Sequence, residues 1–384
     1  MPEFIPALKL SEAFYHEAVR PILERHFPGL PHSAALAGYG SELLGFDTPV
    51  SRDHLWGPRL MLFLTGEDMQ QRRDAIHEAL RRELPVRFRG YSTHFSAPDM
   101  ADGGTRVLQD IAEGPVDPLI IYHTVESFCR DTIGVSQDRN PEPAEWLTFS
   151  EQSLIELTAG RVYHDDLGLE AARARFAYYP REVWLYMLAA QWALIGQEEA
   201  FPGRTWQAGD ALGSRVVTAR LVERLMRLCF LMERTYAPYS KWFGSAFALL
   251  ECAARMAPLL AGALDAADYP TREPFLAGAY TLAAEMHNAL GITAPLDPRT
   301  RTYSGWHALR DGIDPLPDDH PRNTRPHQTI FASRFAEAIQ AEIRDPRVLA
   351  LIPNVGSVSQ FMVESSDALQ NVDFRRRLAP KSSG

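Results

Sequence analysis

Residues 38–64 read GYGSELLGFDTPVSRDHLWGPRLMLFL and decide the fold expected at the start of this chain. The run at 59–64, RLMLFL, is apolar, short and preceded by Trp-Gly-Pro, which is typical of a buried central strand. A second short apolar stretch at 34–37 comes before the glycine turn. The segment therefore predicts a strand, a turn, a short helix and a second strand.

The same segment contains residue types suited to binding a phosphate chain. Gly40 lets a ligand approach the backbone closely, and the Ser41 hydroxyl with nearby N–H groups can donate to phosphate oxygens. Asp53 precedes the apolar run and offers a carboxylate to a divalent metal ion. A surface turn followed by a helix cap would have the same sequence, so both interpretations stay open.

A pair of carboxylates two residues apart would make the metal site stronger. On an extended strand, residues i and i+2 point to the same side, so an Asp-x-Asp pair can hold Mg²⁺ against a triphosphate. Leu55 stands where the second carboxylate would be and cannot bind a metal ion. On the predicted strand at 86–95, VRFRGYSTHF, His94 is the only side chain suited to a metal.

Length and pattern predict two domains. A chain of 384 residues is longer than one hydrophobic core usually supports. Residues 1–140 mix strand and helix patterns, with a helix expected at 8–27, and form an α/β domain. Residues 141–384 are expected to be helical, with an irregular segment near 295–327 that is rich in Pro, Asp, Arg and His.

Composition narrows the classes of partner. Hydrophobic residues make up 46% and charged residues 23%, as in an ordinary globular protein. The net charge of −10 provides no overall basic surface, so we do not expect nucleic acid as a partner. The longest apolar stretches are interrupted by charges and proline, so no membrane partner is expected, and three separated cysteines without a CxxC pair suggest buried thiols in the cytoplasm.

The sequence YHDD at 163–166 is a second candidate for the chemistry. It is expected in a loop between helices, near the junction of the two domains, where substrate clefts often form. Asp165 could act as a general base toward an acceptor hydroxyl, and Asp165 or Asp166 could replace the missing metal ligand. Either carboxylate could equally cap the following helix.

Three further residues could contact a nucleotide. Tyr239 could stack on a base and Lys241 could bind the triphosphate, because aromatic rings and cations at a turn suit these roles. Aromatic residues at a helix junction also pack against each other, so packing is the alternative. Arg59 could reach a phosphate from the start of its strand, or it could be solvated there.

The segment at 38–60, together with ELTAGRVYHDDLG, LAAQWALIGQEEAFPGR and LMRLCFLMERTYAPYSKWFGSAF, resembles an uncharacterised bacterial family of unknown function. That family is similar to the polymerase-β-type nucleotidyltransferase superfamily, and the resemblance runs from about residue 10 to residue 370. It implies an α+β fold: a small mixed-sheet domain followed by an all-helical domain, as in aminoglycoside nucleotidyltransferases. The superfamily's Gly-Ser turn falls on Gly40 and Ser41, its first metal-binding carboxylate on Asp53 and its second on Leu55.

The resemblance also implies an activity. Such a protein would use Mg²⁺ and transfer a nucleoside monophosphate from a nucleoside triphosphate, with ATP as one candidate, to a hydroxyl of a small molecule or protein. The expected metal ligands are Asp53, His94, Asp165 and Asp166, with Asp53 and Asp165 as the catalytic residues. Because Leu55 replaces a carboxylate, a catalytically impaired nucleotide-binding or regulatory protein on the same scaffold is the alternative.

Overall fold

The computed structural model describes residues 3–50, 55–302 and 327–361. These residues form two compact units, one made of residues up to 141 together with 153–177, and the other of 142–152 and residues from 178 onward. Residues 153–177 thus return to the first unit, although the sequence placed them with the helical part. Asp53, and residues 303–326 of the segment expected to be irregular, lie outside the described residues.

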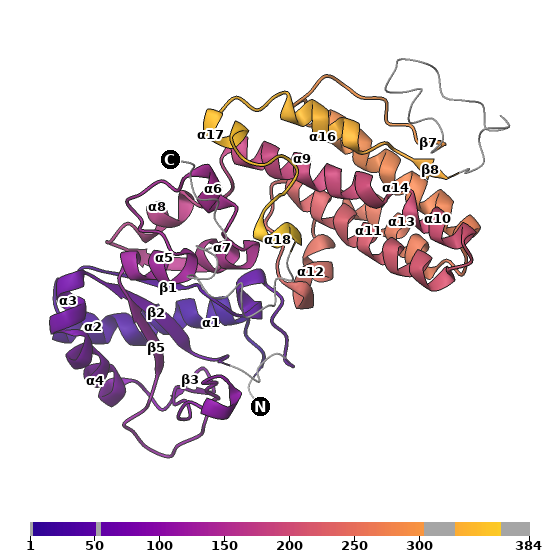
Figure 1. Cartoon of the computed structure of the whole chain (residues 1–384). Coiled ribbons are helices and arrows are strands. Elements are labelled where there is room, and N and C mark those ends of the chain that lie inside the picture. The colour runs from indigo at the N-terminus through magenta and orange to yellow at the C-terminus, as the bar shows by residue number, and fades with distance from the viewer. Residues whose placement is uncertain (1–2, 51–54, 303–326, 362–384) are drawn as a thin grey trace, which may run out of the picture. The chain divides into compact units, whose positions relative to one another are not determined.

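The first unit combines short helices with a sheet (Figure 1). Its helices are Ala7–Phe14 (α1), Arg20–His26 (α2), Gly66–Gln71 (α3), Arg73–Glu83 (α4), Val125–Ile133 (α5), Glu151–Thr158 (α7, whose first two residues belong to the other unit) and Leu169–Ala174 (α8). Its strands are His32–Leu36 (β1), Arg59–Leu64 (β2), Arg87–Phe88 (β3), Tyr91–Ser92 (β4), Leu119–His123 (β5) and Arg161–Asp165 (β6). A π-helical turn, Tyr15–Val19, joins α1 to α2, so the helix expected at 8–27 is confirmed with an irregular centre.

The sheet of the first unit is mixed. Its four strands lie in the order β5-β2-β1-β6. Strand β1 is antiparallel to both β2 and β6, whereas β2 and β5 are parallel. The expected α+β class with a small mixed sheet is therefore confirmed, and the strand predicted at 59–64 has the bounds that the apolar run indicated.

Each face of the central strands packs on a different set of helices, which explains why β1 and β2 are buried throughout. Leu62 belongs to the core that also contains Leu10 and Phe14 of α1. Its neighbour Phe63 points to the other face, where its ring meets Phe128 of α5 at 5.4 Å between centroids. A strand covered on both faces reads as a continuous apolar run rather than an alternating one.

Two expectations for this unit are wrong in detail. The strand predicted at 86–95 is a hairpin in which β3 and β4 have two residues each. Residues 163–166 do not lie in a loop between helices, because 161–165 form β6. Strand β6 is an edge strand with half-exposed side chains, so it needs few apolar residues and its sequence gives no strong strand signal.

The second unit is helical, as predicted. Its helices are Pro143–Trp146 (α6), Arg181–Glu198 (α9), Phe201–Gln207 (α10), Ala211–Met232 (α11), Ser240–Phe247 (α12), Ala253–Asp265 (α13), Tyr269–Ala289 (α14), Ser333–Gln340 (α16), Pro346–Leu349 (α17) and Val358–Phe361 (α18), and Arg301–Thr302 (β7) pairs with Gln328–Thr329 (β8). Helices α9, α11, α13 and α14 run alongside one another in Figure 1. Trp184 and Trp192 of α9 are both buried, so α9 is a central helix of this unit.

Within the described part of the chain, no helix combines the length and apolarity that a membrane crossing would need.

Candidate functional site

The glycine turn, residues 38–41, leaves the end of β1 with backbone angles that favour glycine. Gly38 has φ 84° and Gly40 has φ 134°. A Cβ atom on Gly40 would lie 2.3 Å from Oε2 of Glu42, so no other residue fits without moving the Glu42 side chain. Ser41 begins a short 3₁₀ helix, Ser41–Leu44, and the turn is exposed at Gly40.

Arg59 fastens this turn to the start of β2. Its Nη2 donates to the Tyr39 carbonyl oxygen at 2.8 Å and to Oε1 of Glu42 at 2.5 Å. Both charged side chains are buried, with 3% of Arg59 and 6% of Glu42 exposed. Arg59 is therefore buried rather than solvated, and the contacts that it makes are structural; contact of Arg59 with a phosphate stays a prediction.

Strand pairing brings the glycine turn and the residues just before β2 to one edge of the sheet. Strands β1 and β2 are antiparallel with Ala35 opposite Met61, so the chain after β1 and the chain before β2 emerge at the same edge. The glycine turn follows β1 there, and Leu55 to Pro58 precede β2. Asp53 itself lies outside the described residues.

Leu55 does not occupy an extended strand. Its φ is +50°, in the left-handed region, and its N–H donates to the Arg106 carbonyl oxygen at 3.1 Å. The rule that residues i and i+2 share a face needs an extended backbone, and β2 begins only at Arg59. The expected Asp-x-Asp geometry at 53–55 therefore does not hold at Leu55.

The described carboxylates close to the glycine turn in sequence have partners already. Glu42 is bound to Arg59, as above. Asp47 accepts hydrogen bonds on Oδ2 from the Ala7 backbone N–H at 2.7 Å and from Trp56 Nε1 at 3.3 Å. Each carboxylate anchors the local fold, so neither is free to complete a magnesium site around Asp53.

His94 has a structural partner too. Its Nδ1 accepts a hydrogen bond from the Asp117 backbone N–H at 2.9 Å, which leaves the ring proton on Nε2 when the imidazole is neutral. Among the described residues, the group of His, Cys, Asp and Glu side chains close enough to share a metal ion does not include His94. Metal binding by His94 stays a prediction from the sequence.

Asp165 caps a helix. Its carboxylate accepts from the Ser33 hydroxyl at 2.6 Å and from the backbone N–H groups of Leu169 and Glu170 at 2.8 and 2.9 Å. Burial opposes ionisation of Asp165, but the hydrogen bonds from Ser33, Glu170 and Leu169 together hold its pKa below the usual value. The capping alternative is the one that the structure supports.

Neither Asp165 nor Asp166 can complete a site at the glycine turn. Asp165 pairs with Ser33, near the start of β1, whereas the turn begins at Gly38, beyond the end of that strand. Five residues of extended chain span roughly 16 Å. The expected replacement of the missing ligand by one of these carboxylates is wrong, because antiparallel pairing puts them at the opposite end of β1.

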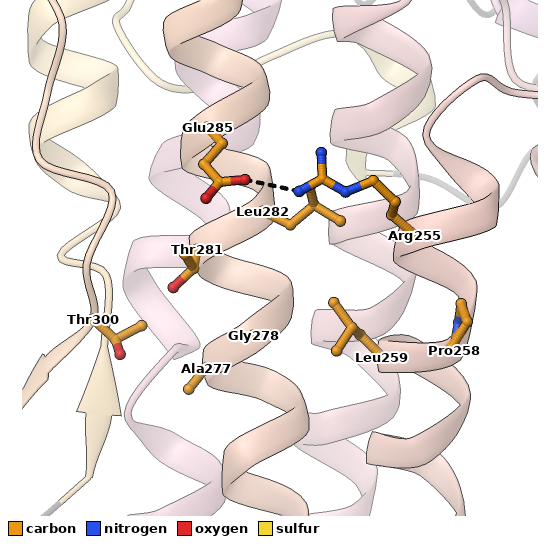
Figure 2. Close-up of a pocket in the computed structure, with 9 residues that line it drawn as sticks. All are labelled: Arg255, Pro258, Leu259, Ala277, Gly278, Thr281, Leu282, Glu285 and Thr300. Atoms are coloured by element: carbon orange, nitrogen blue, oxygen red, sulfur yellow. Dashed lines mark hydrogen bonds and ion pairs between the residues drawn. The ribbon is translucent and has the colours of Figure 1, made fainter.

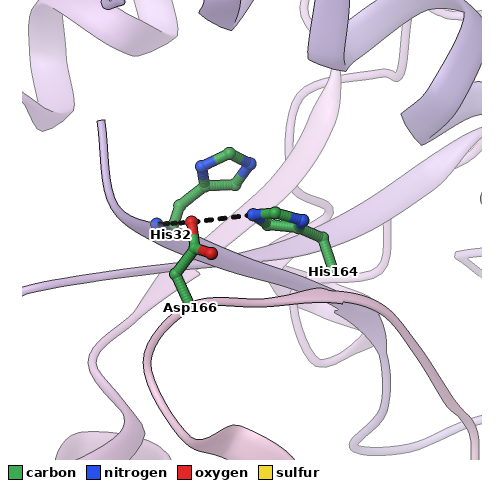
Figure 3. Close-up of side chains that lie close together, drawn as sticks. All are labelled: His32, His164 and Asp166. Atoms are coloured by element: carbon green, nitrogen blue, oxygen red, sulfur yellow. Dashed lines mark hydrogen bonds and ion pairs between the residues drawn. The ribbon is translucent and has the colours of Figure 1, made fainter. Parts of the chain in front are cut away.

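Asp166 instead joins two histidines (Figure 3). His32, His164 and Asp166 each offer a ligand atom, and these atoms all lie within 4.8 Å of one another. Oδ2 of Asp166 lies 2.8 Å from Nε2 of His164 and accepts from the His32 backbone N–H at 3.3 Å. The hydrogen bond from His164 holds the pKa of Asp166 below its usual value.

His32 is the buried member of this cluster. Its Nδ1 lies 2.9 Å from the Leu30 carbonyl oxygen, and its Nε2 lies 2.9 Å from the Tyr15 hydroxyl. Burial lowers the pKa of His32, so the ring is neutral, with its proton on Nδ1 and a lone pair on Nε2. Neither histidine was predicted from the sequence; with 161–165 recognised as a strand, the alternation His164-x-Asp166 would have indicated His164, whereas His32 has no such signal.

Comparison with protein families agrees with the resemblance to a family of unknown function. Residues 146–243 match the family described as Domain of unknown function (DUF4037). Among solved structures, a nucleotidyltransferase-like protein from Exiguobacterium sibiricum 255-15 is similar over 80% of this chain and 85% of that one, with 10% identity and a TM-score of 0.31. No curated protein matches the chain.

Tyr239 and Lys241 belong to the second unit. Tyr239 precedes α12, and its N–H donates to Oε1 of Gln152 at 3.2 Å. Lys241 is exposed, with its Nζ 5.2 Å from the centre of the Trp242 ring. Contact of either residue with a nucleotide stays a prediction.

The second unit also has an apolar groove of about 510 Å³ between α13 and α14 (Figure 2). Leu259 and Gly278 line it, and an ion pair of 3.0 Å between Arg255 and Glu285 crosses one end. The groove contains none of the residues that the sequence analysis singled out. We assign it no ligand.

Proposed function

We propose that this chain is a nucleotidyltransferase-like protein that binds a nucleoside triphosphate at the glycine turn, residues 38–41, and transfers the nucleoside monophosphate to a hydroxyl. The observation that carries the proposal is the way Arg59 and Glu42 hold this turn. A turn whose backbone is fixed before the ligand arrives pays less ordering entropy on binding. The exposed backbone at Gly40 and the hydroxyl of Ser41 are then available to phosphate oxygens.

Magnesium fits this site poorly on the residues that the structure describes. Glu42 and Asp47 have structural partners, and Asp165 and Asp166 lie at the far end of β1. Leu55 adds no ligand. We therefore derive no catalytic step through a metal ion at the glycine turn.

The poor fit of the described residues to magnesium favours a second candidate function. A chain that keeps the turn but lacks a second carboxylate would bind a nucleotide without turning it over, and would act as a regulatory or binding protein. Loss of one metal ligand weakens metal binding severely, whereas phosphate contacts from backbone N–H groups do not depend on that ligand. The two candidates thus share the binding site and differ in turnover.

Two measurements on the full chain separate these candidates. Equilibrium binding of each of the four nucleoside triphosphates, compared with Ser41→Ala, tests the shared site. Pyrophosphate release with Mg²⁺, compared with Asp53→Ala, tests turnover. Nucleotide binding without Asp53-dependent release of pyrophosphate would support the binding or regulatory protein. Absence of binding by all four triphosphates would refute both candidates.

Leu55→Asp tests whether the missing carboxylate limits metal binding. Asp tolerates the left-handed backbone at this position better than Leu does, so the variant should fold. Leu55→Asn is the matched control, because it offers the same shape and backbone tolerance without the charge. If Leu55 has only lost a ligand, Leu55→Asp strengthens Mg²⁺-dependent nucleotide binding in calorimetry and Leu55→Asn does not. Equal affinities in both variants would show that position 55 does not face the metal.

A further inference from the structure

The cluster of His32, His164 and Asp166 forms where two strands of the sheet run side by side. Ala34 lies opposite His164 in the register of β1 and β6, and the Asp166 backbone N–H donates to the His32 carbonyl oxygen at 3.1 Å. Residues opposite one another, and residues two apart on one strand, point to the same face of a sheet. The three side chains therefore converge as a consequence of strand register.

We propose that His32, His164 and Asp166 form a binding site for a divalent transition metal ion of the zinc class. Two imidazole nitrogens and one carboxylate oxygen are the ligand types that Zn²⁺ binds, and three protein ligands leave one position for water. This site is separate from the glycine turn, and the proposal does not depend on nucleotide binding.

The distances suit such an ion after a small adjustment. With metal–ligand bonds of about 2.0 Å, neighbouring ligand atoms in a tetrahedral site lie about 3.3 Å apart. Here the ligand atoms lie within 4.8 Å of one another, and the two imidazole rings are 4.5 Å apart between centroids. A shift of about 1 Å by the half-exposed His164 and Asp166 side chains would close the site.

The surroundings of His32 orient it as a metal ligand. Metal-binding histidines almost always donate their other ring N–H to a carboxylate or a backbone carbonyl. The Leu30 carbonyl oxygen, 2.9 Å from Nδ1 of His32, is such a partner and leaves the lone pair on Nε2 for a metal ion. The Tyr15 hydroxyl now donates to that lone pair, and the metal ion would take its place.

His164 and Asp166, the other two ligands, are joined by a hydrogen bond. Nε2 of His164 and Oδ2 of Asp166 lie 2.8 Å apart, and the carboxylate can accept only if Nε2 donates. On metal binding Nε2 releases its proton to solvent and Nδ1 takes one up from solvent, so the imidazole stays neutral and binds the ion through Nε2. Two neutral imidazoles and one carboxylate give the site one negative charge against the two positive charges of the ion.

Access also fits a metal site. The side chains of His164 and Asp166 are 30% and 45% exposed, so an ion can enter from solvent, whereas His32 is buried at the back. A buried ligand fixes the geometry, and exposed ligands can move onto the ion.

The test is a zinc titration of the full chain after treatment with a chelator, against a chromophoric competitor. We expect one Zn²⁺ per chain, with affinity reduced at least tenfold in His164→Ala and in Asp166→Asn. His26→Ala is the matched control, because His26 pairs with Glu83 on the surface as a His–carboxylate pair without a second imidazole. Its affinity should equal that of the native chain.

A second measurement does not depend on any variant. Co²⁺ bound to the native chain by two imidazoles in a four-coordinate site should give intense visible absorption, and Zn²⁺ should abolish it by competition. Zinc affinity unchanged in both His164→Ala and Asp166→Asn would overturn the proposal. Weak Co²⁺ absorption typical of the hydrated ion would overturn it as well.

Discussion

Removal of the Glu42 carboxylate should destabilise the first unit more than any surface change. The Glu42→Ala variant leaves the Arg59 guanidinium buried without its counter-ion, since only 3% of that side chain is exposed. Breaking a buried ion pair by removing one partner costs about 3–5 kcal/mol. The Tyr39 carbonyl oxygen still accepts from Arg59, so we expect a value near the lower end of this range.

Hydrogen exchange measured by mass spectrometry at increasing urea reports this loss unit by unit. Peptides that cover β1 and β2 follow the first unit, and peptides from α9 and α11 follow the second. A cost of about 3 kcal/mol raises the opening equilibrium of the β1 and β2 peptides by roughly two powers of ten. Peptides from α9 and α11 should not change, which makes them the internal control.

A double variant separates a lost ion pair from a lost side chain. Replacing both partners, Glu42→Leu with Arg59→Leu, removes the charges together, and burial of two apolar side chains is often neutral or stabilising relative to the pair. We expect the double variant to be more stable than Glu42→Ala and to bind nucleotide less well than the native chain, because the turn loses its fastening. A cost below about 1 kcal/mol for Glu42→Ala would refute the reasoning, since it would mean that water reaches Arg59.

The other predictions concern one turn and two buried groups. In calorimetry, Gly40→Ala should weaken nucleotide binding more than Gly45→Ala does. Both positions have positive φ, but only at Gly40 would a Cβ meet another side chain, at 2.3 Å. Equal losses of affinity in the two variants would contradict this. Burial raises the pKa of Glu199 from 4.5 to about 7, so its contribution to stability should fall by about 3 kcal/mol as pH rises across this window. Thermal melts of Glu199→Gln should therefore depend less on pH than those of the native chain. Parallel pH profiles of the two proteins would show that Glu199 does not titrate there. Burial raises the pKa of the Cys129 thiol to about 11, so a thiol reagent at pH 8 should modify it only after unfolding in urea. Rapid modification of Cys129 in the folded chain would contradict its burial.

The sequence by itself determined the class of fold and its strongest elements. The run at 59–64 had to be a central strand, because the five successive apolar residues after Arg59 need cover on both faces, and β2 has those bounds. Helical character was likewise predicted for most of the second unit, where α9 alone spans Arg181–Glu198. Local pattern suffices when an element is long or fully buried.

Only the tertiary structure decided which polar residues meet. Arg59 pairs with Glu42, and Asp165 accepts a hydrogen bond from the first N–H group of α8. The position of Asp165 follows from the pairing of β6 with β1, two strands about 125 residues apart, and no local pattern encodes that register. The same pairing brings His32 to His164 and Asp166. Strand order and register determine which side chains share a site, and both are established only when the elements pack together.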